Sequence, residues 1–174
     1  MKIKKLLSTF ASFLGLATFV QAEPLAVGAP APEVTAVDQD GKEVNFKDVY
    51  AKGPTLVYFY PKADTPGCTK QGCSIRDSWK ELQTAGVQVL GVSEDKPEAQ
   101  KKFKDKYNLP HTLIADNDGK VAKAFQVDMV PVANLTKRQS FLIKDGKVVW
   151  NMLKDTSTEK HAADVLKAVA ALPK

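Results

Sequence analysis

The chain has 174 residues, of which 44% are hydrophobic and 26% are charged, so it holds enough apolar material for one compact domain. Ten glycines, ten prolines and an aromatic content of 8% exclude collagen-like, low-complexity and wholly disordered chains. The formal net charge of +5 points to an anionic partner only if the excess lies on the folded domain, and much of it lies at the N-terminus.

The first 22 residues have the pattern of a secretory signal peptide. Three lysines precede an apolar run from Leu6 to Val20, and the segment ends with small side chains around Ala22, where a peptidase needs room. A membrane-spanning helix needs about 20 apolar residues, which argues against a permanent anchor here. We therefore expect cleavage after Ala22 and export, in a bacterium to the periplasm, with no stable membrane association afterwards.

Residues 23–174 are then expected to form a single domain, and removal of the three lysines lowers its formal charge to +2. The lysine-rich segment 96–106 also contains Glu98 and Asp105, which is typical of a solvated helix face. We expect no nucleic-acid partner, and a monomer or weak dimer.

The predicted elements alternate between apolar strands and amphipathic helices. In chain order they are a hairpin over 34–37 and 44–46, a buried strand over 55–60, a helix over 68–85, a strand over 87–92, a helix over 96–108, a strand over 112–115, a short helix over 121–125, a hairpin over 140–143 and 147–150, and a helix over 157–172. The Asp-Gly pairs at 40–41 and 145–146 mark the two hairpin turns, and Ser157 is the expected cap of the last helix.

This order predicts an α/β, thioredoxin-like fold, with a mixed central sheet flanked by helices and an N-terminal β-hairpin. A fold of this kind assigns no function by itself. The function has to come from particular side chains.

The segment 60–73 carries the residues able to do chemistry, because it runs from the end of a strand through a Pro/Gly loop into a helix. Cys68 is expected in the first helical turn, where free backbone N–H groups and the helix dipole favour a thiolate. Thr65 is placed to direct its hydroxyl into the same pocket, and Pro66 and Gly67 permit close approach of the backbone.

Cys73 follows Cys68 by five residues, which on an intact helix places the two Cα atoms roughly 8 to 9 Å apart. A disulfide needs less than about 7 Å, so the pair can bond only after the helix unwinds locally. A purely structural disulfide closing so short a loop would stabilise the fold by only about 2 kcal/mol. Redox chemistry, a structural role and two buried unreactive thiols remain open at this point.

A metal site is the remaining alternative for the cysteines. The only cysteines and histidines in the chain are Cys68, Cys73, His111 and His161. Their spacing matches no common zinc pattern, and both histidines are interpreted as surface or packing residues. We expect no metal and no other cofactor.

The pattern Pro61-x-x-x-Thr65-x-x-Cys68 resembles the active-site signature of the peroxiredoxins. Cys73, five residues later, resembles the second cysteine of the bacterioferritin-comigratory, or Q-type, subgroup, and the resemblance extends from Leu25 to Leu172. It implies a thiol peroxidase in antioxidant defence that reduces hydrogen peroxide and organic hydroperoxides. It also implies a thioredoxin-like or other thiol reductant.

The resemblance further implies a role for each site residue. Cys68 would be the peroxidatic cysteine that becomes a sulfenic acid, and Cys73 would resolve it to an intramolecular disulfide. Thr65 would hydrogen-bond the thiolate and the peroxide, and Pro61 would shield them from water. Arg138, just before a predicted strand, matches the family arginine whose charge favours the thiolate and holds the peroxide oxygens.

Three residues depart from the family pattern. Ala63 stands where an acidic residue is frequent, Gln71 where many members carry Glu, and His111 where an aromatic residue is common. The run from Val130 to Leu135, before Arg138, also departs from the pattern, and substrate preference and partner docking stay open. A thiol:disulfide oxidoreductase is the alternative enzyme, although such enzymes usually separate their cysteines by two residues rather than four. A non-enzymatic binding domain with a structural disulfide is the third reading.

Overall fold

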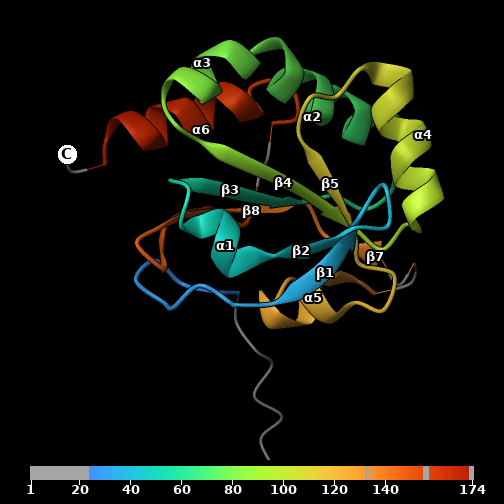
Figure 1. The fold of residues 1–174 in the computed structure, drawn as a ribbon, viewed down its shortest axis with the longest axis horizontal. Helices are drawn as coiled ribbons and strands as arrows, with labels where there is room; N and C mark the ends of the chain where they lie inside the picture. Colours follow the sequence, from blue (N-terminus) through green and yellow to red (C-terminus); the bar gives the residue numbers. More distant parts are fainter. Residues whose placement is uncertain (1–23, 132, 134, 155–156, 173–174) are drawn as a thin grey trace, which may run out of the picture.

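A mixed sheet forms the centre of the computed structural model, which describes residues 24–131, 133, 135–154 and 157–172 (Figure 1). In the described part of the chain the sheet has seven strands in the order β2-β1-β5-β4-β3-β8-β9. They are β1 (Thr35–Asp38), β2 (Glu43–Asn45), β3 (Thr55–Phe59), β4 (Gln88–Ser93), β5 (Thr112–Ala115), β8 (Gln139–Lys144) and β9 (Lys147–Met152). The β3–β4 and β4–β5 pairs are parallel and the others antiparallel, so the predicted mixed sheet and both hairpins are confirmed.

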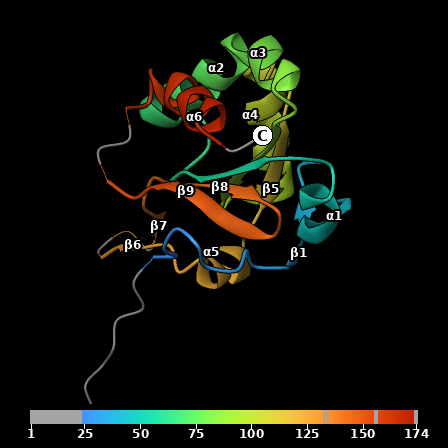
Figure 2. The ribbon, with the colours of Figure 1, turned by 90° about the vertical axis from the view of Figure 1, so that its left-hand side faces the viewer.

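Helices cover both faces of this sheet (Figures 1 and 2). They are α1 (Phe46–Tyr50), α2 (Pro66–Asp77), α3 (Trp79–Thr84), α4 (Pro97–Tyr107), α5 (Lys120–Ala124) and α6 (His161–Ala170). The helices α2, α3, α4 and α6 lie on one face, and α1 and α5 lie on the other. This layered arrangement is the predicted thioredoxin-like fold.

The strand β3 is buried on both faces because its side chains alternate between two cores. Leu56, Tyr58 and the following Tyr60 point into the core beneath α2, α3, α4 and α6. Val57 and Phe59 point into the core beneath α1 and α5. The almost continuous apolar run in the sequence therefore reflects two separate hydrophobic layers.

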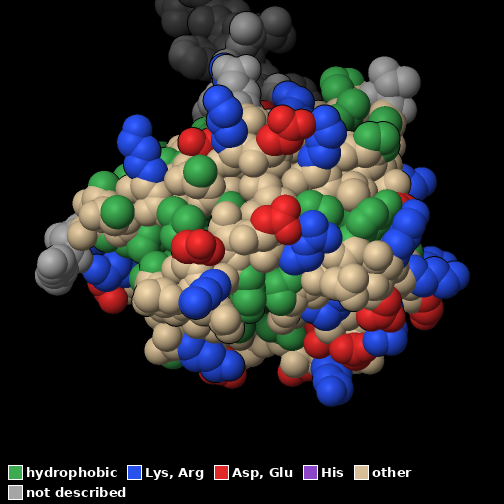
Figure 3. All heavy atoms as spheres, turned by 90° about the horizontal axis from the view of Figure 1, so that it is seen from above, with side chains coloured by type: hydrophobic (Ala, Val, Ile, Leu, Met, Phe, Trp, Pro, Cys, Tyr) green, Lys and Arg blue, Asp and Glu red, His purple; other side chains and the backbone are tan. Residues whose placement is uncertain are grey.

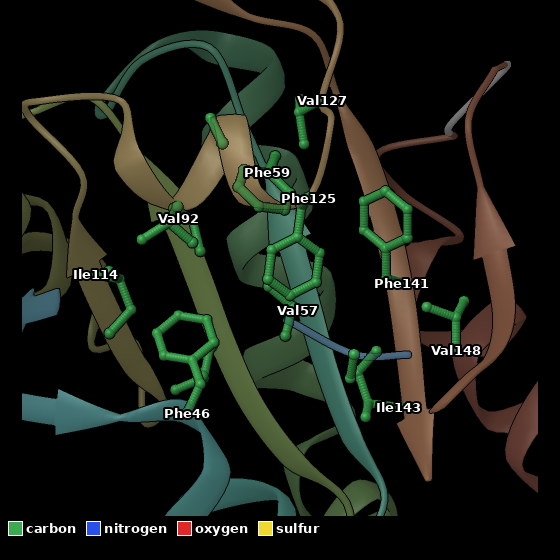
Figure 4. Packing of buried hydrophobic residues seen from close by; sticks show 14 residues of the cluster. Phe46, Val57, Phe59, Val92, Ile114, Phe125, Val127, Phe141, Ile143 and Val148 are labelled. Carbon is green, nitrogen blue, oxygen red and sulfur yellow. The ribbon is translucent and has the colours of Figure 1, made fainter. Parts of the chain in front are cut away.

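The core beneath α1 and α5 is built around an aromatic cluster, which we define as Phe46, Phe59, Phe125 and Phe141 (Figure 4). Phe125 contacts the other three rings at centroid distances of 6.2, 5.4 and 5.3 Å, respectively. Such ring pairs contribute about 0.5 to 1.5 kcal/mol each beyond simple burial. Phe125 directly follows α5, so these contacts fix that short helix to the sheet.

The predicted helix over 68–85 is instead two helices, because the chain leaves the helical region at Ser78, with φ −102° and ψ 18°. Serine competes for its own backbone hydrogen bonds and is a poor residue for a helix interior. The apolar spacing of Ile75, Trp79 and Leu82 is helical across the break, so the pattern alone does not register it. The first helix also begins two residues earlier than predicted, at Pro66, where a proline suits the first helical position.

The last helix begins at His161 rather than near Ser157. The Ser157 hydroxyl accepts the backbone N–H of Lys160 at 3.3 Å, so this serine closes a turn before the helix instead of capping it. The sequence analysis also missed α1 and the small antiparallel pair β6 (Met129–Val130) and β7 (Leu135–Thr136). Elements this short carry no periodicity that could reveal them.

The hypothetical signal peptide over 1–22 lies outside the described residues. Among the helices that the structure does describe, none combines the length and the apolar character needed to cross a bilayer.

Candidate active site

Cys68 lies in the first turn of α2, as the sequence predicted, and only 2% of its surface is exposed. The loop after β3 leads directly into this turn. The backbone N–H groups at the start of a helix have no acceptor within the helix. The helix dipole places a partial positive charge at this end of α2, beside the thiol.

Arg138 supplies the second positive group, because its Nη2 donates to the Cys68 Sγ at 3.5 Å. Sheet register explains this contact across 70 residues of sequence. The strand β8 runs antiparallel to β3 with Gln139 opposite Phe59, so the residue before β8 lies next to the point where the cysteine loop leaves β3. The guanidinium therefore places a positive charge next to the sulfur.

Arg138 is itself held by a chain of buried polar groups. Its Nη1 donates to the Gln71 Oε1, and the Gln71 Nε2 lies 3.3 Å from Nδ1 of His161. The other ring nitrogen of His161 lies 2.9 Å from the Ser140 hydroxyl. Burial, and after it the charge of Arg138, lowers the pKa of His161 to about 3, so this imidazole is neutral.

His111 is the second buried histidine on this side of the sheet. Its Nε2 hydrogen-bonds the Tyr58 hydroxyl at 2.8 Å, and burial, with the charge of Lys104 second, lowers its pKa to about 3. The Tyr58 ring lies between the two imidazoles, at centroid distances of 5.7 Å from His111 and 5.5 Å from His161. Of the two interpretations given to the histidines, the packing one is confirmed, and no histidine is visible among the described residues on the helical face in Figure 3.

Thr65 directly precedes α2, and its hydroxyl donates to the Lys62 carbonyl at 3.0 Å. Its proton is therefore used within the loop and is not available to the sulfur, while its oxygen lone pairs can still accept a hydrogen bond. The structure thus brings Arg138, but not the Thr65 hydroxyl, into hydrogen-bond contact with Cys68.

The loop between β3 and α2 is tied to its surroundings at two points. Asp64 has a left-handed backbone conformation, with φ 59°, and accepts hydrogen bonds from Lys106 Nζ at 2.8 Å and from the Tyr107 hydroxyl at 2.6 Å. The Ala63 N–H donates to the Asp95 carboxylate at 2.7 Å. These contacts hold the loop against α4 and against the end of β4, and so fix the approach to Cys68.

Pro61 is half-buried at the start of the same loop and borders a surface hollow of about 390 Å³. Most of the hollow is lined by polar and acidic residues, including Asp95 and Asp118. Cys68 is not part of this lining, so the hollow adjoins the cysteine loop without opening onto the thiol.

Cys73 lies in α2 together with Cys68, and both thiols are free. The C-terminal half of α2 is anchored at two points. The Ser74 hydroxyl accepts the N–H of Ala162 at 3.2 Å, and Arg76 donates to the Tyr107 carbonyl at 2.9 Å. The predicted placement of both cysteines in one helix is confirmed. Ideal helical spacing then separates their Cα atoms by more than a disulfide allows.

The described residues contain no group of three or more His, Cys, Asp or Glu side chains arranged to hold a metal ion. Neither histidine has a cysteine among its hydrogen-bond partners, since each pairs with a hydroxyl or amide group instead.

The model of the AhpC/TSA family matches residues 27–151. The chain belongs to the AhpC/TSA family. It is 40% identical over 146 residues to peroxiredoxin Q of Oryza sativa subsp. japonica, which covers 83% of this chain and 67% of the rice protein. It is 39% identical over 148 residues to the bcp peroxiredoxin of Coxiella burnetii, which covers 82% of this chain and 97% of that protein.

Solved structures agree with this assignment. Peroxidoxin BcpB from Mycobacterium tuberculosis superposes with a TM-score of 0.80 at 31% identity, covering 86% of this chain and 99% of that one. Peroxiredoxin Q of Xanthomonas campestris gives 0.75 at 27% identity, covering 84% and 96%. The predicted resemblance to Q-type peroxiredoxins, and the prediction of an enzyme of that class, are confirmed.

Sequence reasoning missed three residues of this peroxiredoxin site. Gln71 appeared only as a departure from the family pattern, although its position three residues after Cys68 places both on one helical face. His161 and Ser140 gave no usable signal, because they reach the site from elements 90 and 69 residues away from Gln71.

Proposed function

We propose that this peroxiredoxin is a thiol peroxidase that reduces hydrogen peroxide and organic hydroperoxides at Cys68. One observation carries the proposal: a buried thiol in the first turn of a helix lies 3.5 Å from an arginine nitrogen. The helix N-terminus and the guanidinium both favour the thiolate, which is the reactive nucleophile.

In the first step the Cys68 thiolate attacks the terminal oxygen of the peroxide, so that an S–O bond forms and the O–O bond breaks. The sulfur is oxidised to a sulfenic acid, and the departing oxygen leaves as water or an alcohol after it takes up a proton. Arg138 stabilises the negative charge that develops on the departing oxygen. Thr65 accepts a hydrogen bond from the peroxide, and Pro61 limits the access of water.

In the second step the Cys73 sulfur attacks the sulfenic sulfur of Cys68, so that the S–S bond forms and the S–O bond breaks. The hydroxide that departs takes up the proton released by the Cys73 thiol and leaves as water. Because an intact α2 separates the two cysteines, this step requires the helix to unwind between them. A thioredoxin-like or other dithiol reductant then reduces the disulfide by thiol exchange.

The experiment that tests this function is intact mass analysis of the reduced protein before and after one equivalent of hydrogen peroxide, with the remaining peroxide assayed in parallel. We expect peroxide loss together with the loss of two hydrogens from the protein. Cys68→Ser should show neither change. Full peroxidase activity in that variant, or an unchanged mass and untouched peroxide in the wild type, would refute the assignment.

Cys73→Ser gives a separate prediction for the second step. We expect this variant to consume one equivalent of peroxide, because Cys68 is intact, and then to accumulate over-oxidised Cys68 with poor turnover. Turnover by a dithiol protein at the wild-type rate would exclude a resolving role for Cys73.

We further propose that residues 1–22 are removed and that the domain 23–174 acts outside the cytoplasm, as the basic and apolar N-terminal pattern supports. The reductant would then belong to the exported compartment. N-terminal sequencing of the protein recovered from a periplasmic extract tests this, and an uncleaved chain in the cytosolic fraction would contradict it.

A further inference from the structure

We propose that His161 is a positioning residue for the peroxide reaction, because it orients Gln71 so that Gln71 holds the Arg138 guanidinium against Cys68. The inference rests on the proposed peroxidase function and adds to it a residue from the last helix of the fold. It arises from the direction of each hydrogen bond in the buried chain.

The first link fixes which end of the Gln71 amide faces the arginine. A guanidinium has only donors, so Arg138 has to meet the carbonyl oxygen of Gln71 rather than its NH₂ group. The NH₂ group then faces the opposite way, toward His161, at 3.3 Å. Gln71 is fully buried, so this NH₂ group cannot turn to water instead.

The second link fixes the tautomer of His161. To accept from Gln71, the Nδ1 atom has to be unprotonated, so the ring proton of the neutral imidazole lies on Nε2. That Nε2–H donates to the Ser140 hydroxyl at 2.9 Å. His161 and Ser140 are also fully buried, and the Tyr58 ring packs against the imidazole at a centroid distance of 5.5 Å.

Each bond in the chain therefore depends on the next, from Ser140 through His161 and Gln71 to Arg138. Without an acceptor at Nδ1, the buried NH₂ group of Gln71 has no hydrogen-bond partner, and the side chain gains by moving to another rotamer in which that group is paired. Its carbonyl oxygen then no longer lies where it accepts from Arg138. The guanidinium loses this contact and is held less closely against the sulfur. The lowered pKa of His161 keeps the imidazole in the accepting form under physiological conditions.

His111 provides a matched control within the same chain. It is also a buried, neutral imidazole that packs against Tyr58. Its hydrogen bond goes to the Tyr58 hydroxyl and not to the series of hydrogen bonds that leads to Arg138. Loss of either ring removes a similar buried volume. Only loss of His161 removes the acceptor for Gln71.

The test compares His161→Leu, His161→Asn and His111→Leu with the wild-type protein. The readouts are the second-order rate constant for hydrogen peroxide, from stopped-flow fluorescence, and the pH profile of Cys68 alkylation by iodoacetamide with Cys73 replaced by Ser. We expect His161→Leu to slow the peroxide step by about tenfold or more and to move the alkylation profile to higher pH. Asn places an oxygen near the Nδ1 position, so His161→Asn should stay within about threefold of the wild type. His111→Leu should keep the wild-type rate and profile.

Two results would overturn the proposal. One is a wild-type rate and profile in His161→Leu. The other is an equal decrease of the peroxide rate constant in His161→Leu and His111→Leu that parallels a decrease of their melting temperatures. That result would indicate a general packing role. A further check adds His161→Leu to Arg138→Met, where it should have no additional effect if His161 acts only through the arginine.

If His161→Leu does not fold, His161→Gln replaces it, because the longer amide places its oxygen toward Ser140 rather than toward Gln71. We expect His161→Gln to react with hydrogen peroxide more slowly than His161→Asn does. Equal rate constants in the two variants would refute the proposal. Failure of the wild type to consume peroxide would refute the proposed function instead. The alkylation profiles would still report whether His161 controls the state of Cys68.

Discussion

At Gly67, one residue before Cys68, a methyl side chain would crowd the Arg138 guanidinium. A Cβ atom at this position would lie 3.1 Å from Nη2 of Arg138, the nitrogen that donates to Cys68. We expect Gly67→Ala to displace the guanidinium and slow the peroxide step by about tenfold. The melting temperature should not fall, because alanine favours a helix over glycine by about 0.5 to 1 kcal/mol.

Gly72→Ala is the control for this prediction, since it adds the same methyl group to the same helix. There the new Cβ would meet Leu109 methyl groups at 3.3 Å and no part of Arg138. Peroxide kinetics and thermal melting of the two variants provide the comparison. An equal change of rate in both would mean that helix propensity, rather than the position of Arg138, controls the reaction.

The sequence alone predicted those parts of the site whose residues lie close together along the chain. The strand–loop–helix pattern placed Cys68 in the first helical turn and Thr65 just before it, although the Thr65 hydroxyl turns to the Lys62 carbonyl instead of the sulfur. Arg138 was found only through the family resemblance, because its contact depends on the pairing of β3 with β8. His161 could not be found, since a histidine in an alanine-rich helix gives no sign of a partner 90 residues away.

At the scale of elements, the proposed mechanism requires α2 to hold Cys68 in place and also to unwind between Cys68 and Cys73 before a disulfide forms. Arg76 anchors its C-terminal half through a hydrogen bond to the Tyr107 carbonyl at 2.9 Å. Arg76→Ala removes that anchor, and a loss of about 1 kcal/mol from the helical form corresponds to about fivefold faster disulfide formation. The slow phase of fluorescence after a peroxide pulse measures this rate.

Lys70→Ala is the matched control on the same helix. The Lys70–Glu159 ion pair measures 2.7 Å, but both side chains are more than half exposed, and such pairs contribute little. We expect an unchanged rate of disulfide formation. A rate for Arg76→Ala equal to that of the wild type would show that this anchor does not limit unwinding.

The elements that the sequence predicted correctly are those with local signals. The Asp-Gly turns located both hairpins, and the apolar runs located β3 and β4. The break at Ser78 and the late start of α6 were missed. In both places the chain departs from a helix while its apolar spacing continues, as Trp79 and Leu82 show after the break.

At the scale of the whole molecule, three buried groups make stability depend on pH. The folded pKa of His111 and of His161 is about 3, against 6.5 for an exposed histidine, so only the unfolded chain binds protons at them as the pH falls below 6.5. Asp116 acts in the opposite direction, because burial raises its pKa from 3.8 to about 6 and the folded chain takes up its proton first. Between pH 6 and 4 the unfolded chain therefore gains a net excess of about one proton, and stability falls by about 1.4 kcal/mol per pH unit.

His111→Leu tests this balance. In this variant the proton uptake of the unfolded chain at His161 is offset by the proton uptake of the folded chain at Asp116. The loss of stability between pH 6 and 4 should then nearly vanish, although the variant is less stable at every pH. Urea unfolding at several pH values measures the slope directly. A slope equal to that of the wild type would assign the acid sensitivity to other groups.

The sheet places the aromatic cluster on the face opposite to Cys68 and α2 (Figures 1 and 4). The unwinding of α2 that we propose would therefore change one side of the sheet and leave the aromatic cluster on the other side in place. Hydrogen exchange should show this division, with α2 amides exposed in the oxidised protein and β3 and β4 amides protected in both states. Fold stability and peroxide turnover should therefore respond to different substitutions. Those around Phe125 act on the aromatic cluster and not on the helix that we propose to unwind.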